Sequence, residues 1–342
     1  MSEALHERLR SHASVAIVGT CKNAGKTTCL NALLACLGRD GVRVGLTSVG
    51  RDGEDLDAVT DRPKPRITPV TGSLVATSLV SARRSAARLR EVAPTPFRTA
   101  LGPVGIYEVA GPGWVEVAGP VTVADTVVLV QMLHRHGARQ VLVDGAIDRR
   151  ASASPRVATA MVLATGMALD EDPDTVVDAT RHHVRMLSLP ACQSDLLPAE
   201  TGVRHPDGSW EAFPRSTPLG SPEAWLAWFP AEAIAVGIEG ALTDGVARAL
   251  VRAAASGPDR PRSLVVPDAT HVLLTAASLD RLATAGYDLS VRQRVDLAGV
   301  VVNPTRPWGP SMPPADFLAR MRAALHPVPV HDVVAGDLAP VR

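Results

Sequence analysis

A glycine-rich turn with two lysines lies near the N-terminus, between a short apolar run and a stretch with helical periodicity. The turn reads Gly-Thr-Cys-Lys-Asn-Ala-Gly-Lys-Thr-Thr over residues 19–28 and follows the apolar residues 15–18. Strand, glycine-rich turn and helix is the order that forms a phosphate-binding loop. Backbone N–H groups then surround an anion, and the helix N-terminus adds partial positive charge. An ordinary strand–turn–helix is the alternative. The residues predicted to bind a nucleotide here are Gly19, Thr20, Lys22, Asn23, Ala24, Gly25, Lys26, Thr27 and Thr28.

Lys26 and Thr27 are the chemically distinctive side chains of this turn. We expect the Lys26 ammonium to contact the outer phosphates and the Thr27 hydroxyl to bind Mg²⁺. A carboxylate at the end of another strand would complete the metal site. The apolar run 140–143 ends in Asp144-Gly145, and the carboxyl ends of parallel strands gather at one edge of a sheet. Asp144 is therefore predicted beside Lys26 as a ligand of Mg²⁺, and a helix cap or turn is the alternative.

Two further polar residues follow predicted strands. Asp52 comes after the run 42–48, and we predict that it adds a second carboxylate to the metal site; a polar Asp-Gly turn is the alternative. Asn303 follows the run 297–302, and its amide suits the edge of a nucleobase, with an Asx-turn as the alternative. The predicted catalytic residues are Lys26, Asp52 and Asp144, and the predicted metal ligands are Thr27, Asp52 and Asp144.

Strand and helix patterns alternate along most of the chain, which predicts an α/β fold with a mostly parallel, doubly wound sheet. We predict a single domain over residues 1–342. A stretch at about 190–232, rich in Pro, Gly, Ser and Trp, is predicted to be an irregular excursion from the sheet. The segments 104–109 and 114–117 are predicted to pair antiparallel around Gly111-Pro112-Gly113. Residues 122–136 are predicted to form a helix with Thr122 as its N-cap.

Composition restricts the partners and the compartment. The formal net charge is zero, which argues against nucleic acid or an anionic membrane as a partner. The four cysteines show no C-x-x-C spacing, and the polar residues 1–12 do not resemble a signal peptide, so we predict a cytoplasmic protein. The apolar run 157–169 is too short to span a bilayer. A homodimer is compatible with the sequence.

The glycine spacing points to a family. The turn reads G-x5-G-K-T rather than the common G-x4-G-K-[ST], and in this it resembles dethiobiotin synthetase and the cobyrinate amide synthases among P-loop NTPases. The motifs V-G-T-C-K-N-A-G-K-T-T at 18–28, T-S-V-G-R-D-G-E at 47–54, K-P-R at 64–66 and V-D-G-A at 143–146 resemble the P-loop subunit of the lysine 5,6-aminomutase reactivase.

That resemblance implies an ATP- and Mg²⁺-dependent accessory protein that hydrolyses ATP to exchange a damaged cobalamin in an adenosylcobalamin-dependent aminomutase. The aminomutase, or a second reactivase subunit, would be its partner. Two other functions stay open. One is an ATP-dependent ligase of the dethiobiotin synthetase type that acts on a small carboxylate or amine. The sequence departs from that type because Ser48-Val49-Gly50-Arg51 stands where a catalytic lysine is expected, and arginine stays charged. The other is a nucleotide-binding module without turnover.

Overall fold

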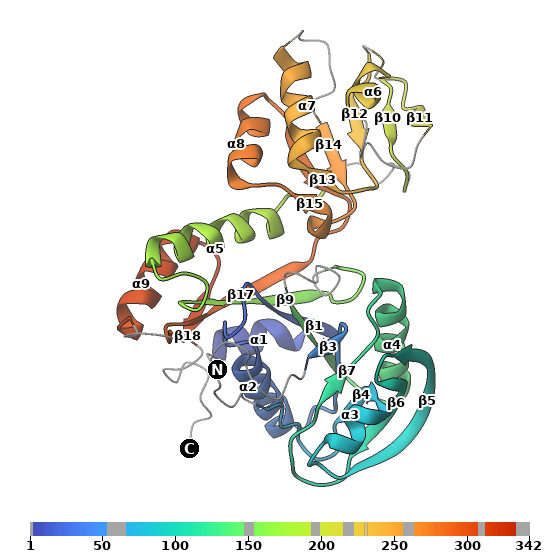
Figure 1. Ribbon diagram of the computed structural model, residues 1–342, viewed down its shortest axis with the longest axis vertical. Helices are drawn as coiled ribbons and strands as arrows, with labels where there is room; N and C mark the ends of the chain where they lie inside the picture. The colour runs from blue at the N-terminus through green and yellow to red at the C-terminus, as the bar shows by residue number, and fades with distance from the viewer. Residues whose placement is uncertain are drawn as a thin grey trace. The chain divides into compact units, whose positions relative to one another are not determined.

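The chain divides into two compact units, each described here by itself. Unit 1 consists of Met1–Arg181 and Val295–Arg342, and unit 2 of His182–Arg294 (Figure 1). The single domain predicted over residues 1–342 differs from this division, because strand–helix alternation does not reveal which sheet a strand joins. The computed structural model describes residues 3–52, 66–146, 154–192, 199–214, 222–228, 230, 232–255, 263–306 and 312–332.

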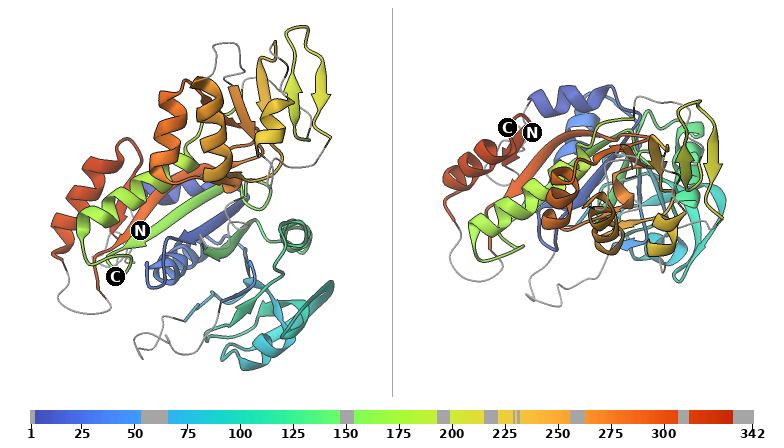
Figure 2. Two further views of the ribbon diagram at one scale, coloured as in Figure 1. Left: turned by 45° about the horizontal axis from the view of Figure 1, so that its top comes forward. Right: turned by 90° about the horizontal axis from the view of Figure 1, so that it is seen from above.

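Unit 1 is built on a large sheet of order β18-β17-β9-β1-β8-β2-β4-β6-β5. The strands from β18 to β4 pair in parallel, and β6 and β5 add an antiparallel end. The strands β17, β9 and β1 are neighbours in the sheet, as the left view of Figure 2 shows. This mixed α/β architecture with a large, mostly parallel sheet confirms the α/β part of the predicted fold class. The strands are β1 (Ser14–Gly19), β2 (Val44–Ser48), β4 (Leu74–Ser78), β5 (Leu89–Thr99), β6 (Gly102–Val109), β8 (Gln140–Ala146), β9 (Ala160–Gly166), β17 (Asp296–Asn303) and β18 (Val330–Asp332).

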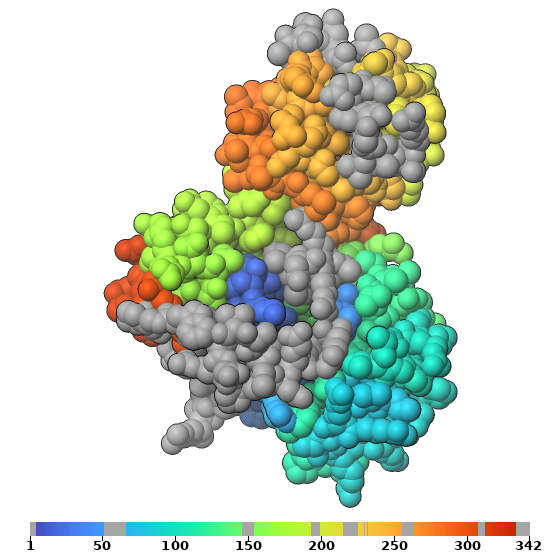
Figure 3. All heavy atoms as spheres, viewed as in Figure 1, coloured from blue at the N-terminus to red at the C-terminus, as the bar shows by residue number. Residues whose placement is uncertain are grey.

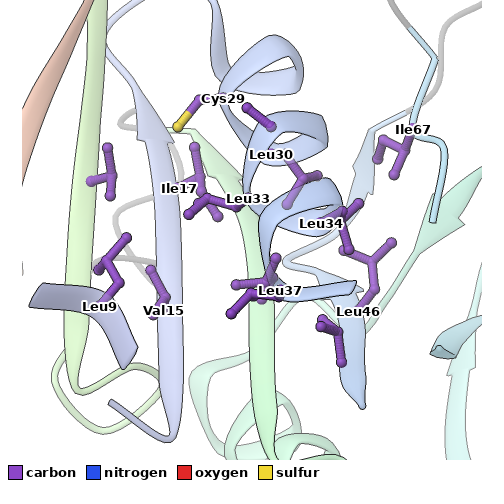
Figure 4. Packing of buried hydrophobic residues seen from close by; sticks show 14 of the residues in the cluster. Leu9, Val15, Ile17, Cys29, Leu30, Leu33, Leu34, Leu37, Leu46 and Ile67 are labelled. Atoms are coloured by element: carbon purple, nitrogen blue, oxygen red, sulfur yellow. The ribbon is translucent and has the colours of Figure 1, made fainter. Parts of the chain in front are cut away.

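Helices cover both faces of this sheet. Successive side chains of a strand point to opposite faces, so a strand that is apolar throughout has an apolar side chain to bury on each face. Leu142 of β8 packs in the cluster that contains the apolar side of α2, whereas its neighbours Val141 and Val143 pack with α4. Figure 4 shows the α2 leucines lying against β1 and β2. Thr122 caps α4 by accepting a hydrogen bond from the Asp125 amide, as predicted. The helices are α1 (Glu3–Arg10), α2 (Lys26–Arg39), α3 (Leu79–Arg84), α4 (Val123–Arg135), α9 (Pro314–Leu325) and α5 (Pro173–Leu187), in which the chain passes into unit 2.

The antiparallel pair predicted for 104–109 and 114–117 is wrong. The strand β6 instead forms a hairpin with β5, through a turn where Gly102 has φ of 98°. The segment after Gly113 packs against the Ala86–Ala87 backbone, and its strand β7 (Val117–Ala118) pairs with β3 (Arg51–Asp52). The glycines at 111 and 113 misled the prediction because a turn signal does not identify the strands that it joins.

Unit 2 has a sheet of its own, of order β11-β10-β12-β14-β16, in which β12, β14 and β16 are parallel. The ring of Trp210 lies over Gly202 and Gly237, where an added Cβ would come within 2.7 and 2.8 Å of ring atoms. Two strands of this sheet, β10 and β11, lie within the stretch 190–232 that was predicted to be an irregular excursion. The elements are β10 (Gly202–Arg204), β11 (Trp210–Ala212), α6 (Pro222–Ala227), β12 (Ala235–Gly237), β13 (Leu242–Thr243), α7 (Asp244–Ala255), β14 (Ser263–Val266), β15 (Val272–Leu273), α8 (Ala276–Thr284) and β16 (Asp288–Val291).

A buried aspartate fixes the loop after β14. The Asp268 carboxylate accepts a hydrogen bond of 2.8 Å from the Thr270 amide and a second from His271. Burial by itself raises the pKa of Asp268, but hydrogen bonds from His271 and Thr270 outweigh it and leave that pKa below the ordinary value. The carboxylate thus stabilises unit 2 above the ordinary pKa of 3.8, and this contribution is lost as pH falls through the lower folded-state pKa.

Asp268 is the N-cap of the short 3-10 helix Ala269–His271. Replacing it with alanine is expected to lower the free energy of unfolding by about 1 kcal/mol at neutral pH, which is the usual cost of losing an N-cap. The difference from the unchanged protein should shrink in acid, below the folded-state pKa. Urea titrations of both proteins at neutral and acidic pH measure this difference in the free energy of unfolding. A difference that stays constant across this range would show that the charge of Asp268 contributes nothing.

Among the residues that the structure describes, no helix has both the length and the apolar character needed to cross a membrane.

Candidate functional site

The turn between β1 and α2 contains two residues in the left-handed backbone region. Asn23 and Gly25 have positive φ angles of 62° and 97°, and alternation into the left-handed region directs successive N–H groups to one side. Gly25 is the N-cap of α2 and provides no side-chain acceptor. The first amides of a helix have no partner within the helix, and the first turn of α2 contains no acidic residue. These amides and the helix dipole favour an anion at this end. We call residues 19–28 the β1–α2 loop.

Gly19 lies directly beneath the side chain of Lys26. A Cβ added at Gly19 would come within 2.7 Å of the Lys26 Cγ and 2.8 Å of its Cδ. Real Cβ atoms do not approach other heavy atoms so closely, so any side chain at position 19 would displace the lysine stem. The absence of a side chain at Gly19 therefore allows Lys26 to lie across the end of β1.

The Lys26 ammonium reaches the next strand. Its Nζ lies 3.6 Å from Oδ1 of Asp144, whose side chain is only 1% exposed. In the sheet, Asp144 of β8 is in register with Ile17 of β1, so the two strands are neighbours and their carboxyl ends coincide. The structure thus brings together the two residues that the sequence predicts to be close. Asp144 lies within β8, which continues to Ala146, rather than just after the strand.

On its other flank the loop is anchored to β9. The Thr20 amide donates to the Ala164 carbonyl at 2.8 Å, and the Thr20 hydroxyl donates to the Thr165 hydroxyl at 3.1 Å. Thr165 is fully buried and is also 2.9 Å from the hydroxyl of Thr180 in α5. Thr20 therefore fixes the loop to the sheet through both its amide and its side chain. Thr165 was not predicted as a site residue, although the apolar run 160–164 that precedes it fits a strand buried on both faces.

Asn303 is brought to the loop from β17. Its Nδ2 donates to the carbonyl of Asn23 at 2.8 Å. Its Oδ1 accepts from the Thr305 amide at 3.0 Å, which is the Asx-turn considered as the alternative to a nucleobase contact. The side chain thus joins the end of β17 to the β1–α2 loop.

The remaining predicted residues are placed as follows. Ala24 is buried, Thr27 and Thr28 are half-buried in the first turn of α2, and Lys22 is exposed. The backbone of Asp52 lies in β3, just beyond β2, where Ser48 is in register with Asp144. The side chain of Asp52 lies outside the part of the chain that the structure describes. Within the described ranges, no group of three or more His, Cys, Asp or Glu residues has the geometry of a metal site.

The thiols of the loop region are not reactive nucleophiles. Burial raises the pKa of Cys21, and a hydrogen bond from Thr20 only partly offsets this effect. Burial raises the pKa of Cys29 to about 12. Both residues remain protonated at neutral pH, and only the thiolate is a strong nucleophile.

Another buried carboxylate, that of Glu116, lies near the carboxyl end of β4. Glu116 is 6% exposed, and its Oε1 accepts from the Ser81 hydroxyl at 2.7 Å and lies 3.8 Å from an Arg84 nitrogen. The Glu116 carbonyl accepts from Thr77, at the end of β4. Its partners therefore hold this carboxylate in a fixed position.

Replacing Gly19 with alanine tests the contact with Lys26. The new methyl group would push the lysine stem aside and move the ammonium away from Asp144. We expect affinity for a polyphosphate to fall by about tenfold, equivalent to roughly 1.4 kcal/mol, with a smaller effect on thermal stability. Isothermal titration with ATP measures this change. Gly41→Ala, at an open turn beyond α2, is the control for general strain, and equal effects of the two substitutions on ATP binding would contradict the argument.

The fold and this site define a mixed α/β protein with a large, mostly parallel sheet, in which a lysine-bearing loop meets a buried aspartate. No protein-family model matches the chain, and the curated proteins and solved structures contain no significant match to it.

In the space-filling view, atoms of the N-terminal segment of unit 1, in blue, reach the surface (Figure 3).

Proposed function

We propose that unit 1 is a P-loop NTPase that binds ATP and Mg²⁺ at the β1–α2 loop. The observation that carries this proposal is the placement of Lys26. Its stem crosses Gly19, and its ammonium lies 3.6 Å from the buried Asp144. In this position the Lys26 ammonium would contact the phosphates, and the Asp144 carboxylate beside it would contact the metal ion that they carry.

The donors around the loop fit this ligand. The amides at the start of α2, the Lys26 ammonium and the exposed Lys22 supply positive charge for phosphates. The Thr27 hydroxyl and the Asp144 carboxylate are hard oxygen ligands of the kind that Mg²⁺ prefers. Mg²⁺, when bound, neutralises charge that develops on the transferring phosphoryl group. Asp52 stays a predicted third ligand.

The ion pair of Lys26 with Asp144 predicts how binding proceeds. A buried carboxylate is costly without a positive partner. When Lys26 turns to a phosphate, Asp144 needs another cation, and Mg²⁺ provides it. The metal and the nucleotide should therefore bind cooperatively, each tightening the affinity for the other.

For the cellular role, we propose an accessory factor that uses ATP to reactivate an adenosylcobalamin-dependent aminomutase. The support is the motif-level resemblance of residues 18–28, 47–54, 64–66 and 143–146 to the reactivase subunit. The presence of a second compact unit, His182–Arg294, is compatible with a protein that binds both a nucleotide and a partner enzyme.

The test is an assay of ATP hydrolysis by the purified chain, alone and with an aminomutase that carries a damaged cobalamin. Stimulation by that enzyme, together with recovery of its activity, supports the proposal. Turnover that instead requires a small carboxylate or diamine with bicarbonate would identify a ligase. ATP binding without turnover under all these conditions would identify a binding module, and absence of ATP binding would overturn the P-loop assignment.

A further inference from the structure

Asn303 reaches the β1–α2 loop from a strand that is not adjacent to β1. It ends β17, which is separated from β1 by β9 in the sheet. Its Nδ2 nevertheless lies 2.8 Å from the carbonyl oxygen of Asn23. This contact links two segments that are 280 residues apart in the chain.

The donor is held rigidly on its own side. The Asn303 carbonyl accepts from the Met167 amide at 3.0 Å. A Cβ at Gly166 would come within 2.3 Å of the same carbonyl oxygen, so Asn303 packs closely on the end of β9. The Asn303 Oδ1 is fixed by the Thr305 amide at 3.0 Å. With its backbone and its Oδ1 engaged, the side chain presents its NH₂ group to the loop in a fixed direction.

The acceptor, Asn23, has a backbone conformation that is less favourable for its residue type than that of Gly25 is for glycine. Asn23 is the only non-glycine residue with positive φ among those that the structure describes, at 62°. This conformation is disfavoured for residues with a Cβ, although asparagine tolerates it better than most. A hydrogen bond to its carbonyl selects this conformation over the extended alternatives. It thereby fixes the direction of the amides that follow, before Gly25 and the start of α2.

We propose that Asn303 is a positioning residue that holds the β1–α2 loop in its anion-binding conformation, rather than a reader of the nucleobase. The inference rests on the proposed function and deepens it. The hydrogen bond to Asn23 persists when the polyphosphate binds. Asn303 therefore contributes to the affinity for the phosphate chain, whatever base is attached.

Inorganic tripolyphosphate separates the two roles because it carries the phosphates of ATP without base or ribose. The substitution Asn303→Ser retains a hydroxyl that can accept from the Thr305 amide, as serine does in turns. It adds no charge and is too short to reach the Asn23 carbonyl. Asn31→Ser is the matched control, since Asn31 of α2 also bonds backbone groups through both amide atoms, at Arg66 and Thr68.

The experiment measures the affinities of ATP, GTP and tripolyphosphate for the unchanged full chain, Asn303→Ser and Asn31→Ser, all with Mg²⁺. We expect Asn303→Ser to weaken all three by the same factor of about five, the usual effect of one neutral hydrogen bond. Asn31→Ser should leave the three affinities within about twofold of the unchanged values. Weaker ATP binding with unchanged tripolyphosphate binding would show a base contact and overturn the proposal, as would no change at all.

Hydrogen exchange of the loop amides in the nucleotide-free protein provides the second measurement. Amides of residues 23–26 should exchange about fivefold faster in Asn303→Ser than in the unchanged chain, and those of β1 should not. Equal exchange would overturn the inference. If the unchanged chain bound none of the three ligands, the proposed function would fail, and the exchange rates would still decide whether Asn303 orders the loop.

Discussion

Lys26→Ala is expected to reduce the affinity for ATP by about two to three orders of magnitude, equivalent to roughly 3–4 kcal/mol. The stem of Lys26 lies across Gly19, and its ammonium lies at the carboxyl ends of β1 and β8. Its loss removes a full charge from the point where the outer phosphates would lie. Equilibrium titration with ATP, with and without Mg²⁺, measures the change.

Lys22→Ala is the control for this substitution. It removes the same charge from the same loop, but Lys22 is exposed to solvent, where screening weakens electrostatic attraction. We expect a loss of about threefold or less, in line with the small energies of exposed charge pairs. Similar losses for the two variants would show that general charge, and not the placement of Lys26, governs binding, and unchanged ATP binding in Lys26→Ala would refute the site.

Lys26→Ala also leaves Asp144 buried without the cation that faces it in this structure. Breaking a buried ion pair by removing one partner costs up to about 3–5 kcal/mol, and the partial exposure of the Lys26 side chain, 16%, reduces that cost. The double variant Lys26→Ala/Asp144→Asn removes both charges and should recover part of the lost stability. A fold check by circular dichroism therefore accompanies the binding experiment, and the double variant separates loss of binding from loss of structure.

The sequence was informative where chemistry and local pattern coincide. The glycines, Lys26 and the apolar run before them predicted the strand–loop–helix unit. The run 140–143 predicted the strand that places Asp144 at the same edge, because parallel strands align their carboxyl ends. Asn303 was predicted from the same logic, and it does lie at the loop, although it contacts the backbone of Asn23 in this structure.

Long-range pairing was not predictable in the same way. Nothing in the residues 104–109 states that they pair with β4 and β5, because strand pairing depends on packing between distant segments. The buried Thr165 resembles any threonine at the end of an apolar run, and its role as the partner of Thr20 depends on β9 lying beside β1. The division into two units was hidden for a similar reason, since β12, β14 and β16 repeat the pattern of the first sheet.

The second large effect is expected from Asp144→Asn, which keeps the size and shape of the side chain but removes its charge. An amide oxygen is a weaker ligand for Mg²⁺ than a carboxylate oxygen, since the attraction to the ion is mainly electrostatic. We expect kcat for ATP hydrolysis to fall by about 100-fold or more, as when a single charge-stabilising group is lost from an active site.

Asp144→Asn should lower kcat, but it should not lower the affinity for ATP in the absence of Mg²⁺. In the unchanged chain the Lys26 ammonium lies 3.6 Å from the Asp144 carboxylate, so a phosphate competes with that carboxylate for the lysine. Asp144→Asn removes the competitor. Affinity for ATP without Mg²⁺ should therefore be equal to or greater than that of the unchanged chain, while the gain in affinity on adding Mg²⁺ should largely disappear.

Titrations with ATP in EDTA and in excess Mg²⁺, beside single-turnover hydrolysis, measure the three quantities. Asp52→Asn, measured in parallel, tests the predicted third ligand and should show the same pattern, more weakly, if Asp52 contacts the metal through water. Turnover in Asp144→Asn equal to that of the unchanged chain would remove Asp144 from the metal site. A metal-dependent gain that survives in Asp144→Asn but is lost in Asp52→Asn would instead place the ion against β3, because Asp144 would then serve only as the counter-charge of Lys26.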